Sequence, residues 1–302
     1  MTRGSSLLAA AMLGLFFLIG CATMVEMGTT AGYEAGVITK QEKEYYDRRA
    51  LETESAVRPM NDREEYYVGR AVAATVLGSY RLYQDDRLTR YVNEVGQAVA
   101  LSSDRPLTYR GYHFAVLDSD EVNALACPGG TILITRGMIN RARNEEELAA
   151  ILAHEVAHVN HKDGVNAIQR SRWVQAAASL GADAARQLGR GELDELASLF
   201  EGSVGDVVKT LVVNGYSRTQ ELAADRSAMI FMARVGYDPN ALTDYLGRLA
   251  KEQGAGAHEG FFATHPGMAA RLTEAQAFVS ANNRWQRVNH QLRDQRFAAY
   301  RR

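Results

Sequence analysis

A His-Glu-x-x-His pattern at residues 154–158 constrains the fold of this chain more than any other feature. On a helix, residues four apart share a face, so the imidazoles of His154 and His158 can hold one metal ion. The intervening Glu155 then points toward a water molecule on that metal. The surrounding stretch is apolar at helical spacing, which indicates a helix buried on one side. An exposed helix with two incidental histidines does not explain three polar side chains in so hydrophobic a stretch.

A catalytic zinc ion needs a third protein ligand, because its tetrahedral site takes three protein groups and leaves one position for water. Glu221 stands 63 residues after His158 on a separate segment with a helical pattern, and would complete a set of two histidines and one glutamate. Asp225 follows one turn later and can reach the outer N–H of a ligand histidine or the path of the proton. His161 could also approach the metal, but three histidines from one helix would strain the geometry, so a surface position is favoured. The sequence therefore predicts one Zn²⁺ per chain, bound by His154, His158 and Glu221.

The helix that carries the pattern has recognisable ends. Asn144 can cap its first turn, and Glu147 stands three residues later, as in a capping box. Gly164 is expected to end the helix as a C-cap.

The rest of the chain predicts more helices and two short strands. The helices follow from apolar residues at helical spacing, and the strands from β-branched and aromatic residues between turn signals. These elements predict a mainly helical α+β fold with a small β-sheet beside the active-site helix. The expected helices cover residues 62–82, 86–101, 217–235, about 239–252 and about 264–280, and the expected strands cover 112–117 and 130–135, with a turn at Pro128-Gly129-Gly130.

Three segments carry weaker patterns. Residues 165–214 lie between the proposed ligands, with a helical pattern over 167–188 and many helix breakers over 189–205. They form either a lid over the cleft or a plain supporting pair of helices. Residues 254–260 are a Gly-rich break, and residues 282–302 are basic and are expected to be peripheral.

Four motifs follow one another in the chain. They are Asn123-Ala-Leu-Ala-Cys-Pro-Gly-Gly130 with its extension to Gly137, His154-Glu155-Val-Ala-His158, Glu221-Leu-Ala-Ala-Asp225, and Thr264-His265-Pro266 with its extension to Arg271. In this order they resemble the zinc metallopeptidase family that contains the CAAX prenyl proteases and the bacterial heat-shock peptidase HtpX. The resemblance covers about residues 60–280.

The resemblance implies a zincin-like catalytic domain of the gluzincin type. The residues that match His154, His158 and Glu221 bind zinc in that family, in agreement with the ligand set above. The residue that matches Glu155 is the catalytic base, and the one that matches Asp225 handles a proton or orients a ligand.

Two further features gain a function from the resemblance. His265 is implied to be an active-site group that could donate to the oxyanion, and a histidine in the cap region of a helix is the alternative. In zinc peptidases of this type, an exposed edge strand beside the metal pairs with an extended substrate. The strand expected at 130–135 is assigned to this role, and a structural hairpin is the alternative.

The family members implied are the soluble periplasmic ones, because the transmembrane helices of the prenyl proteases and HtpX are absent here. We therefore expect a zinc-dependent endopeptidase that cleaves extended or misfolded envelope proteins, in protein quality control or outer-membrane assembly. A periplasmic chaperone or assembly factor with a latent protease site is the alternative. Glu155 favours the enzyme, because a purely structural zinc site has no use for a base that binds no metal.

The N-terminal residues resemble a bacterial lipoprotein signal. Arg3 is their only charge, the apolar run from Leu7 to Ile19 is short for a membrane span, and Leu18-Ile19-Gly20-Cys21 follows. The expected division is a signal peptide over 1–20, a tether over 21–57 and a zinc metallopeptidase domain over 58–302. An uncleaved signal anchor is the alternative.

Cys21 is then lipidated, and the protein is held at the periplasmic face of a bacterial membrane. Ala22 in the next position resembles lipoproteins sorted to the outer membrane rather than the inner one.

Charge and cysteine content limit the partners. The net charge of the whole chain is −2, and loss of residues 1–20 removes only Arg3, which leaves 33 basic and 36 acidic side chains and a charge of −3. This balance suggests no nucleic-acid partner. The expected partners are polypeptide substrates and, through Cys21, the membrane. Cys127 would remain as a small half-buried residue.

Overall fold

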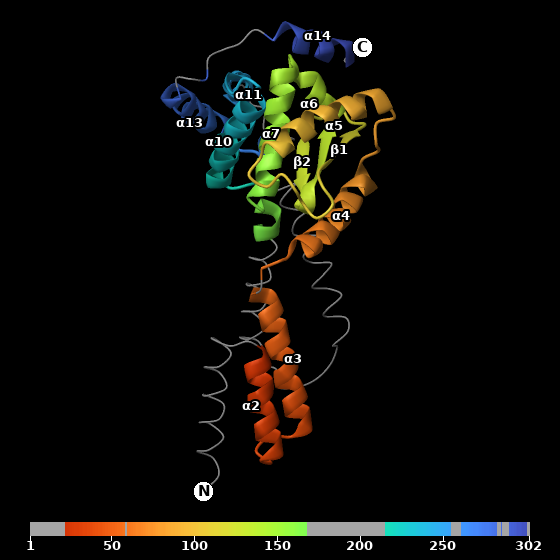
Figure 1. The fold of residues 1–302 in the computed structure, drawn as a ribbon, viewed down its shortest axis with the longest axis vertical. Helices are drawn as coiled ribbons and strands as arrows, with labels where there is room; N and C mark the ends of the chain where they lie inside the picture. The colour runs from red at the N-terminus through yellow and green to blue at the C-terminus, as the bar shows by residue number, and fades with distance from the viewer. Residues whose placement is uncertain are drawn as a thin grey trace. The chain divides into compact units, whose positions relative to one another are not determined.

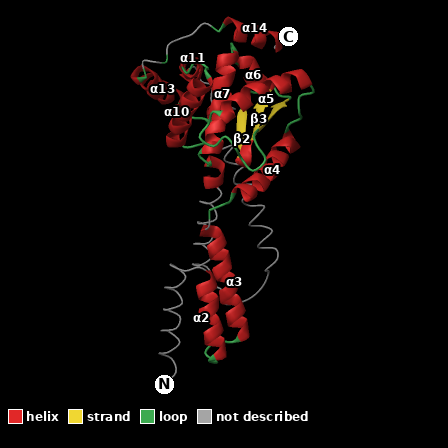
Figure 2. Ribbon diagram, viewed as in Figure 1, coloured by secondary structure: helices red, strands yellow, loops and turns green. Residues whose placement is uncertain are grey.

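The structure is a computed structural model that describes residues 22–57, 59–167, 215–254, 261–282, 285 and 290–300 (Figures 1 and 2). The chain divides into two compact units, with the boundary near residue 60. The predicted signal over 1–20, Cys21, residues 168–214 of the segment between the ligands, and the Gly-rich break over 255–260 lie outside the described residues. No helix among the described residues is long and apolar enough to cross a membrane.

The first unit contains two helices that lie side by side, α2 (Ala22–Glu34) and α3 (Lys40–Val57). Both helices fall within residues 21–57, which we expected to be a tether. The turn between them is closed by Thr39, whose hydroxyl and backbone N–H both donate to the carboxylate of Glu42.

The second unit holds all of the motifs, and it is mainly helical with one small sheet, which confirms the predicted fold class. Its elements are α4 (Asp62–Ser79), α5 (Asp86–Leu101), β1 (His113–Leu117), β2 (Ala124–Cys127), the 3-10 turn η1 (Pro128–Gly130), β3 (Thr131–Thr135), α6 (Arg136–Arg141), α7 (Glu145–Asn160), α10 (Arg218–Val235), α11 (Asn240–Gly254), α12 (Phe261–Thr264), α13 (Met268–Ala281) and α14 (Gln291–Tyr300).

The three strands lie in the order β1-β3-β2, with β1 parallel and β2 antiparallel to β3. The prediction that the strand at 130–135 is an edge strand is therefore wrong, because β3 pairs on both sides. The tight turn at η1 folds residues 124–127 back onto β3 as an extra strand. The sequence hid this strand, because Ala-Leu-Ala-Cys contains no β-branched or aromatic residue. Among the described residues, β2 pairs with β3 alone.

Helix α7 forms the centre of the second unit and lies between the sheet and helix α10 (Figure 1). Every residue from Glu145 to Val159 is buried. Helices α5, α10 and α11 pack against it, and their apolar side chains join those of the sheet in one core. A helix buried on all sides explains why its apolar residues are so dense.

The two ends of α7 differ from the prediction in detail. The side chain of Asn144 accepts the backbone N–H of Glu147 at 2.9 Å, as expected of a cap. The carboxylate of Glu147 instead accepts the backbone N–H of Arg143 and pairs with Arg248, so the reciprocal capping-box bond does not form. The helix ends at Asn160 rather than at Gly164.

A left-handed residue explains the early end of α7. Lys162 has φ 56°, and residues 163–167 are helical again, which places Gly164 inside the next helical segment. Because this reversal follows directly after α7, the side chain of Asp163 turns back toward the last turns of that helix, and its carboxylate lies 2.7 Å from His158.

The C-terminal helices confirm most of the predicted boundaries. Helix α10 begins after Ser217, which forms a capping box with Gln220, and ends at Gly236 in the left-handed conformation. Helix α13 begins at Met268, four residues later than predicted, because the short helix α12 ends at Thr264 and Pro266 lies in the link between them.

The expectation that residues 282–302 are peripheral is wrong for α14. Phe297 is buried in the main core, and Tyr300 stacks on Tyr91 with ring centroids 4.2 Å apart. Arg296 pairs with the buried carboxylate of Glu145 at the start of α7. The basic residues of this segment thus neutralise acids of the active-site helix.

Helix α4 packs closely against the turn between β2 and β3. A Cβ atom added to Gly69 would lie 1.7 Å from the carbonyl oxygen of Pro128, whereas one added to Gly78 on the same helix would meet nothing within 4 Å. The absence of a side chain at Gly69 therefore allows the turn to dock.

We predict opposite effects of alanine at these two glycines. Gly69→Ala should lower the free energy of unfolding by about 1–3 kcal/mol, because the methyl group forces α4 and the turn apart. Gly78→Ala should raise it by about 0.5–1 kcal/mol through helix propensity alone. Urea unfolding of both variants tests the packing, and equal stability of the two would contradict it.

Candidate active site

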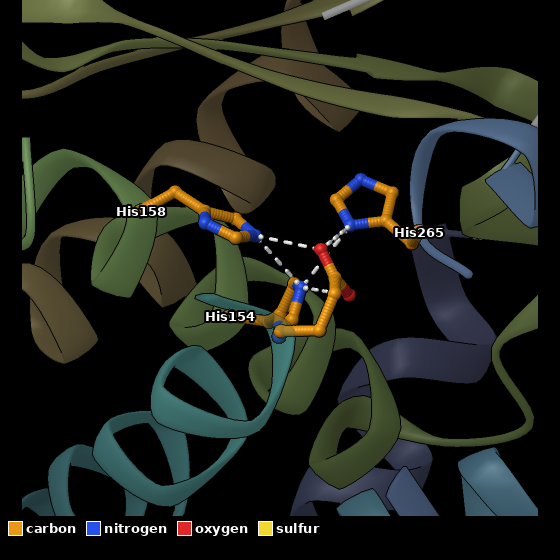
Figure 3. Close-up of side chains that lie close together, drawn as sticks. His154, His158 and His265 are labelled. Carbon is orange, nitrogen blue, oxygen red and sulfur yellow. Dashed lines mark hydrogen bonds and ion pairs between the residues drawn. The ribbon is translucent and has the colours of Figure 1, made fainter. Parts of the chain in front are cut away.

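Four side chains point toward one small volume in the second unit. One ligand atom from each of His154, His158, Glu221 and His265 lies within 4.8 Å of all the others. Figure 3 shows the three histidine side chains close together. The Nε2 atoms of His154 and His158 are 3.1 Å apart, and each lies 3.5 Å from a carboxylate oxygen of Glu221. The structure therefore brings together the three predicted metal ligands.

Three elements supply these side chains. His154 and His158 lie one turn apart on α7, and Glu221 is in the first turn of α10, which packs against α7. His265 follows α12, and its Nδ1 lies 3.0 Å from Glu221 Oε1. Phe261 stacks on the His265 ring at 4.3 Å and holds it in place.

Carboxylates hold the outer nitrogens of both α7 histidines. Asp225 Oδ1 lies 2.9 Å from Nδ1 of His154, and Asp163 Oδ2 lies 2.7 Å from Nδ1 of His158. Of the two positions that the sequence left open for Asp225, the structure shows the one at the histidine's outer nitrogen. With both Nδ1 atoms occupied in this way, both Nε2 atoms face the shared centre.

Arg271 supplies the buried positive charge of the site. Its guanidinium donates to both carboxylate oxygens of Asp225 at 2.7 Å and lies 2.5 Å from Glu221 Oε2. Burial alone would raise the pKa values of the two acids, but the charge of Arg271 outweighs it. The pKa of Glu221 is held well below its usual value, and that of Asp225 is lowered as well. Both acids are therefore carboxylates at neutral pH.

Glu155 lies beside this cluster with its carboxylate unused. Neither of its oxygens has a hydrogen-bond partner among the described residues, although the side chain is fully buried. Its Oε1 lies 3.7 Å from Nε2 of His265. Burying a carboxylate without a hydrogen-bond donor costs free energy, so this group is expected to bind a water molecule or a substrate.

The residues present fit a zinc ion. Two imidazole nitrogens and a carboxylate are a ligand set that catalytic zinc takes, and the outer carboxylates fix the tautomer that binding requires. His154 and His158 would bind through Nε2 and Glu221 through its carboxylate. The unpartnered Glu155 beside them is the group expected next to an open fourth position.

Tyr216 is the aromatic neighbour of the cluster. Its ring stacks on His158 with centroids 3.9 Å apart and planes at 22°. The hydroxyl is buried and has no hydrogen-bond partner among the described residues. Burial and, next, the charge of Glu155 hold its pKa well above the usual value.

Sequence reasoning missed four groups of the site. Asp163 and Tyr216 lie outside the quoted motifs, and Arg271 was quoted in a motif without a function. Gln220 was missed too; its amide donates to Asp163 at 2.8 Å and so links that acid to the cap of α10. A buried arginine could have been inferred from the excess of acids near the ligands. No pattern in the sequence indicates a role for Tyr216.

Two other residues settle smaller expectations. His161 is outside the cluster, and its Nε2 lies 3.0 Å from Ser227 Oγ, in agreement with a position away from the metal. Cys127 is fully buried rather than half-buried, because β2 packs against both α4 and α7. Burial raises the pKa of its thiol to about 12, which leaves it unreactive.

Two histidines and a glutamate on facing helices, with a free carboxylate between the histidines, define the site of a zinc metallopeptidase. Residues 86–279, more than half of the chain, match the sequence model of Peptidase family M48. The chain belongs to this family, and the family inferred from the four motifs is confirmed.

The relatives include proteases with two different names. The chain is 29% identical over 222 residues to the beta-barrel assembly-enhancing protease of Escherichia coli, which covers 70% of this chain and 43% of that protein. It is 27% identical over 193 residues to the mitochondrial metalloendopeptidase OMA1 of Schizosaccharomyces pombe, which covers 63% and 53%. The chain thus spans about half the length of the curated relatives it matches.

We predict that Asp163 contributes to metal affinity without touching the metal. Asp163→Ala should weaken zinc binding by about 10–100-fold, because Nδ1 of His158 loses its partner. Glu221→Ala should weaken it further, since a ligand is lost, and should also lower the stability that metal binding provides. His161→Ala is the matched control and should bind zinc as the unmodified protein does.

Competition with a chromophoric chelator measures the three affinities. Metal loss in His161→Ala with full binding in Glu221→Ala would show that the ligand set is wrong. Unchanged affinity in Asp163→Ala would show that the His158–Asp163 contact does not tune the site.

Proposed function

We propose that this protein is a zinc-dependent endopeptidase that cleaves peptide bonds in extended or misfolded polypeptides of the bacterial envelope. The observation that carries the proposal is Glu155, a buried carboxylate that has no donor among the described residues and lies beside three side chains that can bind a metal. Membership of Peptidase family M48 supports the reaction class, and the names of the relatives support a polypeptide substrate.

The mechanism assigns one task to each side chain. When bound, zinc would polarise the substrate carbonyl and lower the pKa of a water molecule to about 7. Glu155 accepts the proton of the attacking water and then passes it to the nitrogen of the leaving amine. Asp225 and Asp163 keep His154 and His158 in the tautomer and orientation that metal binding requires.

His265 lies beside the residues that would hold the zinc ion. Its Nδ1 faces Glu221 and His154, at 3.0 and 3.3 Å, and its Nε2 is on the side of Glu155. Burial lowers its pKa, so the ring is neutral and one nitrogen carries a proton. We propose that it donates this proton as a hydrogen bond to the carbonyl oxygen on which negative charge develops.

The substrate is proposed to bind along β2. This strand pairs with β3 on one side only among the described residues, and it packs against α7, which carries Glu155. An extended polypeptide can add to such an edge through main-chain hydrogen bonds that are blind to sequence. This mode suits misfolded proteins, whose only common feature is exposed extended backbone.

One observation favours a second candidate, a chaperone or assembly factor with a latent protease site. None of the five side chains His154, Glu155, His158, Glu221 and His265 is more than 2% exposed. Side chains so deeply buried leave little surface at the centre for a polypeptide. A protein that binds polypeptides without admitting them to this centre would act as the second candidate does.

We further propose that the protein is a lipoprotein, anchored through Cys21 at the periplasmic face of a bacterial membrane, more specifically the outer one. The proposal rests on Leu18-Ile19-Gly20-Cys21 after a short apolar run and on Ala22. A relative is named for beta-barrel assembly, a process of envelope proteins. In this arrangement, residues 21–57 tether a catalytic domain that begins near residue 58.

We predict that Glu155→Gln abolishes proteolysis and keeps zinc. The amide preserves the shape of the side chain but cannot take a proton, whereas the ligand set is untouched. Cleavage of an unfolded model protein and metal content by mass analysis should be measured on one preparation. Glu121→Gln, at an exposed glutamate, is the matched control and should cleave normally. Undiminished cleavage by Glu155→Gln would exclude Glu155 as the base.

We predict that Cys21→Ser abolishes membrane association. Without the thiol, the chain is either left unprocessed or released without acyl groups, and its charge of a few units attracts it little to an anionic surface. Cell fractionation and the mass of the mature N-terminus test this. Wild-type protein found without acyl groups in the soluble fraction would contradict the proposed anchor.

A further inference from the structure

The hydroxyl of Tyr216 is a second buried polar group beside the metal ligands for which the described residues offer no hydrogen-bond partner. The side chain is 5% exposed, and no donor or acceptor among the described residues reaches its oxygen. The other large buried tyrosines of this unit are satisfied. Tyr91 and Tyr237 donate to Glu145, and Tyr112 donates to the carbonyl of Arg105. An unpaired hydroxyl is thus a local property of this site and not of the core in general.

The ring of Tyr216 contacts a metal ligand and shares an apolar cluster with the proposed substrate strand. One face stacks on His158, and the side chain belongs to the same apolar cluster as Leu125 and Cys127 of β2. A polypeptide paired with β2 and cleaved beside Glu155 would run close to this ring. Tyr216 therefore borders the space that the scissile peptide would occupy.

The backbone fixes Tyr216 to the segment that carries His265. The N–H of Tyr216 donates to the carbonyl of Thr264 at 3.0 Å. Gly215 before it has φ 69°, and a Cβ atom there would lie 2.4 Å from the same carbonyl oxygen. Since the two segments touch so closely, the side chains of Tyr216 and His265 are held on one support, with rings 6.0 Å apart.

We propose that Tyr216 is a further catalytic residue, whose hydroxyl donates a hydrogen bond to the carbonyl oxygen of the scissile peptide as negative charge develops on that oxygen. The inference rests on the proposed endopeptidase function. A phenol has an ordinary pKa of about 10 and keeps its proton at neutral pH, so it acts as a donor without proton transfer. The hydroxyl has no partner among the described residues of the free protein. It is therefore a preorganised donor that needs no reorientation during the reaction.

The test compares Tyr216→Phe with Tyr112→Phe in the zinc-loaded, full-length protein. Tyr216→Phe keeps the ring on His158 and removes only the hydroxyl. We expect kcat to fall by about a hundred-fold with KM little changed, as for loss of one oxyanion donor. The Tm should stay the same or rise, because no hydrogen bond is lost and an unpaired buried group is removed. Tyr112→Phe should show the reverse, a lower Tm with unchanged kcat, because its hydroxyl is partnered on both sides.

A binding measurement provides a readout apart from turnover. A peptide phosphonate carries charged oxygens on a tetrahedral phosphorus and resembles the transition state, so its affinity by calorimetry should fall in Tyr216→Phe by the same factor as kcat/KM. Unchanged zinc content confirms that the metal site is intact. Wild-type kcat and wild-type phosphonate affinity in Tyr216→Phe would overturn the inference, and so would higher activity in Tyr216→Ala, which would show that the ring covers the cleft.

The glutamate variant separates this inference from the proposed function. If Glu155→Gln still cleaves, the endopeptidase mechanism fails and the inference fails with it. If Glu155→Gln is inactive while Tyr216→Phe cleaves and binds normally, the endopeptidase mechanism stands and only the role of Tyr216 is rejected.

Discussion

The buried ion pair of Arg271 with Asp225 and Glu221 is the interaction on which the metal site depends. Two carboxylates at 2% exposure or less would normally be protonated, and a protonated Glu221 could not bind a metal well. The planar guanidinium bonds to both oxygens of Asp225 and reaches Glu221 as well, a geometry that lysine cannot reproduce. Since Arg271 comes from α13 and the acids from α10, docking of these two helices sets the charge state of a ligand.

The same contact extends to the histidines. Asp225 contacts Nδ1 of His154, and Arg271 in turn binds Asp225. The orientation of His154 therefore depends on Arg271, which is 117 residues away in the chain. Asp163 does the same for His158 and is held in turn by Gln220 at the cap of α10. Each histidine of α7 is therefore oriented by an acid, and a residue of α10 or α13 holds that acid in place. A site supported on packed helices in this way can keep its ligand geometry without a metal.

Buried groups without partners indicate where the substrate goes. In most of the core, polar groups are satisfied; even the three consecutive acids at the start of α7 find partners in Tyr91, Arg248 and Arg293. Beside the metal ligands, Glu155 and the hydroxyl of Tyr216 have no hydrogen-bond partner in the part of the chain that the structure describes. The contrast suggests that these two positions are arranged for water and substrate and that stability is given up there for function.

The sequence by itself determined the local features. Spacing on one helix face placed His154, Glu155 and His158 together, and the caps at Asn144, Ser217 and Gly236 fixed helix ends, because these effects act within a few residues. Pairing between distant segments was decided by the tertiary structure alone. The short apolar run at 124–127 became an edge strand only because a tight turn folds it onto β3, which displaced the edge from 131–135. Arg271, Asp163 and Tyr216 acquired their positions in the site through helix docking and chain reversal, which depend on contacts between segments that no local periodicity records.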